Sequence, residues 1–376
     1  MKFLIVDTFY HYFLNSFYAQ NPVLVGSPYS RQWRALMDQC FGTADFYSHN
    51  LHLLGHEATE VIANCEHLQR QWAEENGVDL EEPKWRWKID RRAGFLPWPK
   101  RIQSEDWLYD ILTVQVKHYH PDILYIQDMN STPSCFLQET RPHVRLVVGQ
   151  IGCPISPKID FKQYDLVLSS LPYYVERFRN KGLKSELFRL GFERTISDRL
   201  MKKSSPYPVV HVGSYDSLHQ ERNKLLEALI EHGIPLGCWG FGIEHLSVAS
   251  PIHRCYQGEA WGLKMYNIRH NSLIVVTKHI SSVAKGHAAM MTLFEATGVG
   301  SLLVIDHAKD LPILFEPGKE LVAYRTPNEC AELIQYYLEH DKEREAIAKA
   351  GQQRTLKEHT FYHRMQELLE IVRKCL

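Results

Sequence analysis

The sequence GHAAMMTLFEATGVGSLLVID, residues 286–306, predicts a helix, a glycine-containing turn and a buried strand in immediate succession. Residues 288–297 have a helical pattern, Gly298 and Gly300 end it, and residues 301–305 form a short apolar strand. A helix that leads into a buried strand is half of a parallel α/β layer, and such layers bind ligands beyond the carboxyl ends of their strands. The stretch therefore predicts an α/β fold.

Glu295 carries the single charge of this predicted helix and strand. A carboxylate at this position can accept hydrogen bonds from ribose hydroxyls, while backbone N–H groups at the helix start face phosphate oxygens. The alternative is a solvated carboxylate on a helix that a glycine ends. Both interpretations stay open at this point, and the first makes Glu295 a candidate nucleotide-binding residue.

The length of 376 residues exceeds what one hydrophobic core usually organises, so we expect two domains, residues 1–193 and 194–376. Residues 191–205 lack periodicity and end near Ser-Ser-Pro, which is typical of a domain boundary. The last helix, near residues 360–375, can pack back on the first domain. Each domain is long enough to bury a core of its own.

Composition excludes several classes of partner. Lys and Arg number 43 against 44 acidic residues, a net charge of -1, which argues against nucleic acid and anionic membranes. The apolar start of the chain is too short to span a membrane, so we expect no integral membrane segment. The 8 cysteines form no CxxC pair and indicate reduced thiols in the cytoplasm. The 20 histidines show no HExxH or clustered ligand spacing, so we expect surface or packing histidines and no metal site.

Helices and strands alternate along the first half, which predicts a doubly wound, parallel sheet. Between the strands we expect a long aromatic-rich loop at residues 10–29, one helical pattern at 30–54 and a tryptophan-bearing irregular insertion at 78–101. Asp7 and Asp128 directly follow two of the strands. Strands are expected at residues 2–6, 58–63, 122–127, 144–150, 166–170 and 186–190.

The second half repeats the α/β alternation and contains a turn suited to phosphate. Gly213 and Ser214 follow a strand and precede a helix with Arg222 in its first turn, an arrangement that can hold a phosphate. The full GxxxxGK[ST] motif is absent, so an ordinary βα turn is the alternative interpretation. Strands are expected at residues 209–212, 236–239, 272–277, 301–305 and 320–324.

Short motifs across most of the chain give a more specific indication. They are Val148-Gly149-Gln150-Ile151, Tyr164-Asp165-Leu166 with Ser169-Ser170, Val212-Gly213-Ser214-Tyr215 with Glu221-Arg222, Trp261-Gly262-Leu263-Lys264-Met265-Tyr266, Phe294-Glu295-Ala296-Thr297-Gly298-Val299-Gly300, Phe315-Glu316-Pro317-Gly318-Lys319-Glu320, and His359-Thr360 with His363-Arg364. Together these segments resemble the spore-maturation-protein-like (CgeB-like) branch of the GT-B glycosyltransferases.

The resemblance implies a GT-B fold, with two Rossmann-like doubly wound domains facing an inter-domain cleft. It implies a glycosyltransferase that moves a sugar from a nucleoside-diphosphate sugar to an unidentified acceptor, which could be a glycan, a peptide or a small molecule. The nucleotide sugar would bind mainly to residues 194–376, with Glu295 on the ribose and Gly213, Ser214 and Arg222 near the diphosphate. No cofactor and no bound metal is expected, because fixed cations and a helix N-terminus can stabilise the departing diphosphate.

One departure from the family pattern concerns positive charge. The family carries an Asn-Met-Arg-like run before the Phe-Glu pair, where this chain has Met290-Met291-Thr292, and Thr277 stands where an Asn is usual. Cations nearby in the sequence are candidates to compensate, at Lys278, His279, Lys285 and His287. The alternative is a degenerate transferase-fold protein that acts as a binding or regulatory subunit.

A general base is required if the reaction inverts the anomeric centre. Asp7, His11 and Asp128 are candidates by position, since each lies at or just beyond the end of a predicted strand. The alternative for each is a structural role at the strand end. A retaining reaction would not require such a base.

Overall fold

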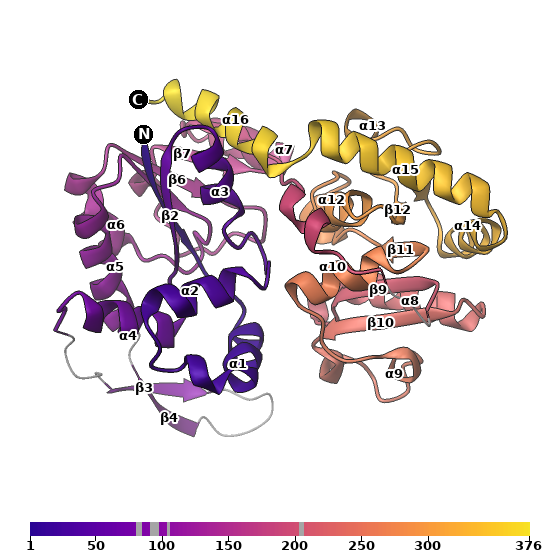
Figure 1. Ribbon diagram of the computed structural model, residues 1–376, viewed down its shortest axis with the longest axis horizontal. Helices are drawn as coiled ribbons and strands as arrows, with labels where there is room; N and C mark the ends of the chain where they lie inside the picture. The colour runs from indigo at the N-terminus through magenta and orange to yellow at the C-terminus, as the bar shows by residue number, and fades with distance from the viewer. Residues whose placement is uncertain (80–84, 91–97, 104–105, 203–206) are drawn as a thin grey trace. The chain divides into compact units, whose positions relative to one another are not determined.

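The computed structural model describes residues 1–79, 85–90, 98–103, 106–202 and 207–376, with only the backbone for 85–90, 98–103 and 106. Contacts divide the chain into two compact units. The first comprises Met1–Asp38, His56–Gln150 and Ser156–Asp165, and the second comprises Gln39–Gly55, Ile151–Ile155 and Leu166–Leu376. Two parallel sheets surrounded by helices account for most of the structure (Figure 1).

The first sheet has six strands in the order β2-β1-β5-β6-β7-β8. All of them lie at positions that the alternation of apolar runs and helical patterns predicts, so the prediction of a doubly wound sheet is confirmed. Strand β5 is buried throughout, as expected for a central parallel strand with helices on both faces. The strands are β1 (Lys2–Asp7), β2 (Glu57–Ile62), β5 (Ile123–Ile126), β6 (Leu146–Gln150), β7 (Leu166–Ser169) and β8 (Ser185–Leu187). The helices that alternate with them are α4 (Glu66–Glu75), α5 (Asp106–Tyr119), α6 (Ser134–Thr140) and α7 (Pro172–Arg179).

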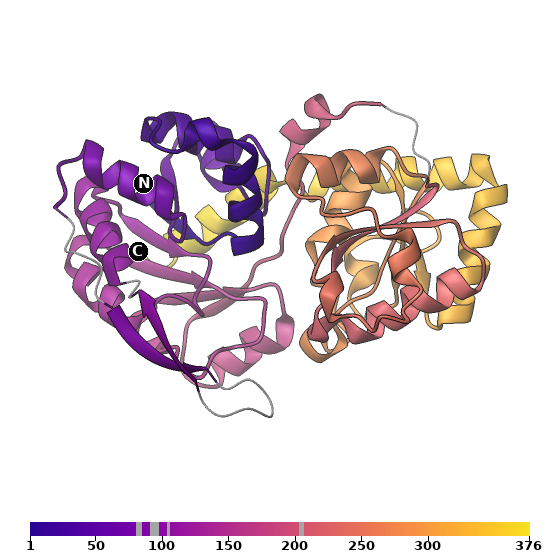
Figure 2. The same ribbon diagram turned by 90° about the horizontal axis from the view of Figure 1, so that it is seen from below.

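The second sheet has five strands in the order β10-β9-β11-β12-β13, and every adjacent pair is parallel. Helices lie on both sides of it (Figure 2). Its strands are β9 (Val209–Ser214), β10 (Leu236–Phe241), β11 (Ile274–Thr277), β12 (Leu302–Asp306) and β13 (Val322–Tyr324). Its helices are α8 (Gln220–Glu231), α9 (Ile252–Cys255), α10 (Gly262–His270), α11 (Ser281–Ala284), α12 (Met291–Gly298), α13 (Leu311–Leu314), α14 (Pro327–Glu339) and α15 (Asp341–Glu358).

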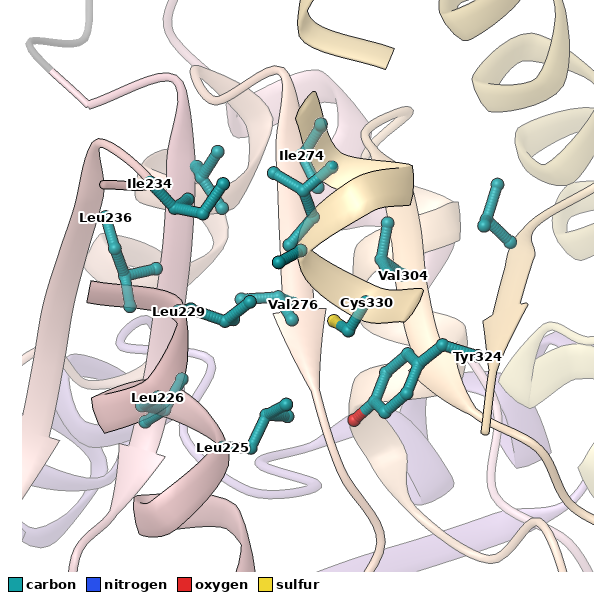
Figure 3. Packing of buried hydrophobic residues seen from close by; sticks show 14 of the residues in the cluster. Leu225, Leu226, Leu229, Ile234, Leu236, Ile274, Val276, Val304, Tyr324 and Cys330 are labelled. Atoms are coloured by element: carbon teal, nitrogen blue, oxygen red, sulfur yellow. The ribbon is translucent and has the colours of Figure 1, made fainter. Parts of the chain in front are cut away.

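One buried cluster joins this sheet to helices α8 and α14 (Figure 3). Leu225, Leu226 and Leu229 of α8 meet Val276 of β11 and Cys330 of α14, and all five side chains are buried. The spacing of the three leucines places them on one helix face, which is the amphipathic pattern that the sequence shows. Helices α10 and α12 pack against each other and against β9 and β12. The helices thus hold the carboxyl ends of the strands in fixed positions.

Both sheets have a topological switch point, where successive strands are added on opposite sides of the first strand. In the second sheet the switch point lies between β9 and β11, and in the first sheet between β1 and β5. Open α/β sheets bind ligands in the crevice beyond the carboxyl ends of the strands at such a point. Topology therefore directs attention to the residues that follow β9 and β11, and to those that follow β1 and β5.

Some local predictions were wrong. Helix α1 (His11–Gln20) occupies part of the predicted loop, because Phe13, Leu14, Phe17 and Tyr18 recur at helical spacing and are buried. Residues 78–101, predicted as irregular, include strand β3 (Trp85–Asp90), which pairs antiparallel with β4 (Trp98–Gln103); the tryptophan side chains lie outside the described residues.

The predicted helix at 30–54 is two helices, α2 (Tyr29–Met37) and α3 (Phe46–Leu53). Between them Cys40, Gly42 and Ala44 have positive φ angles of 53°, 60° and 39°, a backbone conformation that ends a right-handed helix. The key helix α12 likewise begins at Met291, later than predicted, because Met290 is extended and the N–H of Ala288 donates to Asp310 at 2.6 Å.

The last helix, α16 (Phe361–Arg373), packs against α3 within the second unit. The ring of Phe361 lies 5.3 Å from the ring of Phe46 and 5.5 Å from that of Tyr47. Thr360 and His363 form a capping box at its start. No helix in the described ranges is both long and apolar enough to cross a membrane.

Candidate functional site

The turn after β9 is built around Gly213 and Ser214. The Arg222 guanidinium, from the first turn of α8, donates to the carbonyl of Ser214, and the Ser214 hydroxyl donates to Asp216 at 2.7 Å. Arg222 is buried, and burial lowers its pKa to about 10, so it stays protonated at neutral pH. Sequence and structure thus agree that a cation lies beside this turn, but the guanidinium points at the protein backbone.

A histidine that the sequence analysis did not single out lies beneath the same turn. His211 is 1% exposed, and its Nδ1 donates to the carbonyl of Val276 at 2.9 Å, so in the neutral ring Nε2 is an acceptor. Burial, followed by the charges of Arg222 and Arg269, holds the pKa of His211 well below its usual range. Among the described residues Nε2 has no hydrogen-bond partner. A methyl group at Gly213 would lie 2.8 Å from this nitrogen, so glycine leaves the space that the imidazole uses.

Three of the predicted cations line one pocket beyond the carboxyl ends of β11, β12 and β13. Lys278 and His279 follow β11 directly, and His287 comes from the loop before α12. The pocket has a volume of about 380 Å³, and its lining includes Lys278, His279, His287, Asp306, Tyr324 and Arg325. The structure therefore brings Lys278, His279 and His287 together at the carboxyl-terminal edge of the sheet, the edge at which open α/β sheets bind ligands.

Asp306 balances part of this positive charge. It accepts from the backbone N–H and from Nδ1 of His279, each at 2.8 Å, and Lys278 Nζ lies 3.6 Å from its other oxygen. Burial opposes its ionisation, but the contacts with His279 and Lys278 outweigh burial and lower the pKa of the carboxyl. Lys278 also lies 3.4 Å from Glu221 at the start of α8. The site is therefore a mixed network, and Lys278 is shared between two carboxylates.

Glu295 is buried at 6% exposure, so the solvated-carboxylate interpretation is wrong. Its Oε2 is paired with Nη1 of Arg269, on the last turn of α10, and its Oε1 accepts from the Tyr266 hydroxyl at 3.4 Å. Arg269 Nη2 also donates to the carbonyl of Val212 at 3.3 Å, one residue before Gly213. Through Arg269, Glu295 is joined to the turn after β9.

In the first unit, Asp7 ends strand β1 and Asp128 follows the adjacent strand β5, at the switch point of that sheet. Thr8 lies between them, since its N–H donates to Asp7 at 2.7 Å and its hydroxyl donates to Asp128 at 2.7 Å. Asp128 also accepts from two backbone N–H groups in the turn that follows it. His11 is the first residue of α1 and its side chain is exposed. The structure thus joins the two aspartates through one threonine.

Three members of these networks are not among the residues predicted from the sequence. Arg269 has a signal, since it lies three residues beyond Tyr266 of the Trp-Gly-Leu-Lys-Met-Tyr motif and hence on the same helix face. His211 is a polar residue inside an apolar strand, a pattern that indicates a buried polar contact. Asp306 ends β12 as Asp7 ends β1. Among the described residues, no group of three or more His, Cys, Asp or Glu side chains is arranged to hold a metal ion.

Comparison with protein families gives one match, in the second half of the chain. Residues 221–370 match the family described as glycosyl transferase-like. This range contains α8 from its second residue, the pocket and Glu295. No curated protein matches the sequence.

Solved structures with the same fold cover the whole chain. A glycosyltransferase from Rickettsia africae aligns with a TM-score of 0.59 at 11% identity, covering 100% of this chain and 98% of its own. Sucrose-phosphate synthase from Thermosynechococcus elongatus gives 0.58 at 11% identity, with 100% and 99% coverage. Anabaena HepE, solved in complex with UDP-glucose, gives 0.58 at 14% identity, with 100% coverage of both chains. The chain therefore has the GT-B fold, and its residues 221–370 are similar to the family described as glycosyl transferase-like.

Proposed function

We propose that the protein is a glycosyltransferase that takes its sugar from a nucleoside-diphosphate sugar, with the donor held by residues 194–376 and the acceptor by residues 1–193. The observation that carries the proposal is the convergence of buried cationic and hydrogen-bonding groups at the switch point of the second sheet, around Gly213 and the pocket of Lys278. Anabaena HepE, which shares the fold, was solved with UDP-glucose, and this supports a UDP-sugar as the first donor to test.

The diphosphate is assigned to the ends of β9 and β11. Lys278 and the imidazoles of His279 and His287 supply donors on one side, and the Gly213-Ser214 turn with Arg222 supplies backbone and charge on the other. Backbone N–H groups at the start of α12 add the positive end of a helix. Fixed charges of this kind stabilise a leaving diphosphate without a bound metal. Metal independence is therefore part of the proposal.

The ribose is assigned to Glu295. Within the part of the chain that the structure describes, each carboxylate oxygen has one partner, Arg269 or Tyr266, and an ionised carboxylate has about four acceptor positions in all. The remaining positions are suited to vicinal hydroxyls. The side chain is 8% exposed, so the proposal requires it to move when a ligand binds.

The Asp7 and Asp128 pair is assigned to the acceptor. If the reaction inverts the anomeric centre, one of these carboxylates is the general base and Thr8 orders the pair through its two hydrogen bonds. His11 is a second candidate for that role. The free cysteines of the chain are consistent with a cytoplasmic setting, which we include in the proposal.

A specific observation favours a second function, that of a nucleotide-binding or regulatory subunit without turnover. Thr292 and Thr277 stand where the resemblance leads one to expect an arginine and an asparagine, and Lys278 is shared between Glu221 and Asp306. Such a protein would keep the fold and the affinity for nucleotide while losing the capacity to stabilise the leaving group.

The experiment measures binding and turnover separately. Thermal unfolding with UDP, GDP, ADP and TDP at millimolar concentration detects binding, because a ligand present at a hundredfold excess over its Kd stabilises the folded state by about 2.7 kcal/mol. Mass spectrometry of the matching nucleotide sugars, incubated with and without EDTA, detects hydrolysis or transfer. Binding with turnover supports the transferase, and binding without turnover supports the regulatory subunit. No stabilisation by any of the four nucleotides would contradict both.

A further inference from the structure

A guanidinium from helix α10 lies beside the first turn of α12. The Oγ1 of Thr292, in that turn, accepts from Nη2 of Arg269 at 3.4 Å. Arg269 belongs to the last turn of α10, 23 residues earlier in the chain. The positive charge is therefore present beside Thr292, although the sequence of α12 does not carry it.

Arg269 is the most buried arginine partner in this network, with 2% exposure. Its Nη1 pairs with Glu295, its Nη2 reaches the Val212 carbonyl at 3.3 Å, and its Nε has no partner among the described residues. A guanidinium has five donors in a fixed plane, so the same group can hold a carboxylate and a carbonyl at once. The Arg269 guanidinium thus fixes the position of Glu295 relative to the turn that begins at Gly213.

Tyr266 acts on the other carboxylate oxygen of Glu295. Tyr266 and Arg269 are three residues apart on α10 and so lie on the same helix face. Tyr266 is 1% exposed and donates to Oε1 of Glu295 at 3.4 Å, while Arg269 holds Oε2. The two side chains of α10 therefore determine the plane in which the carboxylate lies.

We infer that Arg269 is a positioning residue, which orients the Glu295 carboxylate toward the ribose hydroxyls of the donor. The inference rests on the proposed function, because it takes Glu295 to be the ribose acceptor.

The test removes the guanidinium from α10 and then supplies one from α12. Arg269→Met removes it, and Arg269→Met combined with Thr292→Arg places one on α12 beside Glu295. Isothermal titration with UDP, in buffer without metal, compares both variants with the wild type. Loss of a charge-assisted contact should weaken UDP about tenfold to a hundredfold in Arg269→Met, and the relocated arginine should restore affinity to within about threefold.

A second ligand separates positioning from folding. The 2′,3′-dideoxy analogue of UDP lacks the hydroxyls that Glu295 is proposed to accept, so its affinity should be nearly the same in the wild type and in Arg269→Met. A structural defect would weaken both ligands alike. If Arg269→Met does not fold, Arg269→Lys keeps the positive charge without the planar set of donors. We expect Arg269→Lys to weaken the binding of UDP about tenfold and to leave the affinity for the analogue unchanged.

The outcomes are distinct. UDP binding that is unchanged in folded Arg269→Met or Arg269→Lys would overturn the inference while leaving the proposed function intact. Equal losses for UDP and the analogue, or restored stability without restored affinity in the double variant, would likewise overturn it. A wild type that binds no nucleoside diphosphate would overturn the proposed function and the inference together.

Discussion

Glu295→Gln is the substitution whose consequences follow most directly from the structure. Glutamine keeps the volume and the helix propensity of glutamate and removes only the negative charge. In the folded protein that charge is the partner of Arg269, and the two side chains are 8% and 2% exposed. The substitution therefore leaves a buried guanidinium without its counter-charge.

Two magnitudes follow. Breaking a buried ion pair by removing one partner costs about 3 to 5 kcal/mol, so the free energy of unfolding of the ligand-free protein should fall by that amount. The carbonyl oxygen of glutamine is also a weaker acceptor for ribose hydroxyls, because charge-assisted hydrogen bonds contribute about 1.5 to 3 kcal/mol. The Kd for the nucleotide should accordingly rise about tenfold to a hundredfold.

Urea unfolding and isothermal titration of UDP measure these quantities on the same preparations. Glu66→Gln is a matched control, since Glu66 pairs with Arg70 at 2.7 Å on α4 but is 54% exposed. An exposed pair contributes at most about 1 kcal/mol, so the control should lose little stability and no affinity. Stability of Glu295→Gln equal to that of the control would refute the buried pair. Unchanged affinity with lost stability would remove Glu295 from the donor site.

Three further predictions concern the turn, the buried histidine and the acceptor side. Gly213→Ala places a methyl group 2.8 Å from His211 Nε2 and 3.3 Å from Arg222 Nη2. Overpacking of this kind should lower the free energy of unfolding in urea by about 1 to 3 kcal/mol and weaken the binding of UDP. Unchanged stability would show that the turn has room for the methyl group. His211→Asn should reduce acid sensitivity. The pKa of His211 in the folded protein lies well below the ordinary value of 6.5, so below pH 6.5 the unfolded chain binds a proton at this residue and the folded chain does not. The free energy of unfolding therefore falls, as the pH is lowered, by up to about 1.4 kcal/mol per pH unit. Urea unfolding between about pH 7.5 and about pH 5 should show a smaller slope in the variant, with a remainder from groups such as His359, whose pKa burial lowers to about 4. An identical slope would mean that His211 does not contribute to it. If Asp128 is the general base, Asp128→Asn should lower kcat about a hundredfold or more without changing the Kd for UDP. An unchanged kcat would mean that another residue is the base, and Asp7→Asn tests the second candidate in the same way.

The sequence was sufficient to predict the architecture because the pattern of parallel strands is local. The five strands of the second sheet are apolar runs next to glycines and helical patterns, and their buried centres, such as Val276 and Val304, carry the signal directly. The strand ends then identify Gly213 and Asp7 without knowledge of the fold. Topology adds only that these ends are switch points.

Local conformation was less predictable where single residues decide it. Helix α12 begins at Met291 because Asp310, 22 residues later, holds the N–H of Ala288, and no periodicity encodes that contact. The break between α2 and α3 depends on positive φ angles at Cys40, Gly42 and Ala44, and of these only Gly42 is a residue type that favours this conformation. A tertiary contact thus decides where α12 begins, and single backbone conformations decide where α2 and α3 separate.

The candidate site shows the same division. Lys278, His279 and His287 are adjacent to predicted strand or helix ends, and proximity in sequence was a good guide to the pocket that they share. The partner of Glu295 was not predictable in this way, because Arg269 comes from another helix and meets Glu295 only after α10 and α12 pack. Burial of Glu295 is likewise a property of that packing.

Hydrogen–deuterium exchange with and without UDP tests the central claim most directly, since it reports where on the chain a nucleotide binds. We predict reduced exchange at the turn after β9, in the loop between β11 and α12 and at the start of α12, with little change around β1 and β5. Protection confined to the segments after β1 and β5, or no protection at a UDP concentration that raises the melting temperature, would contradict a donor site at the switch point of the second sheet.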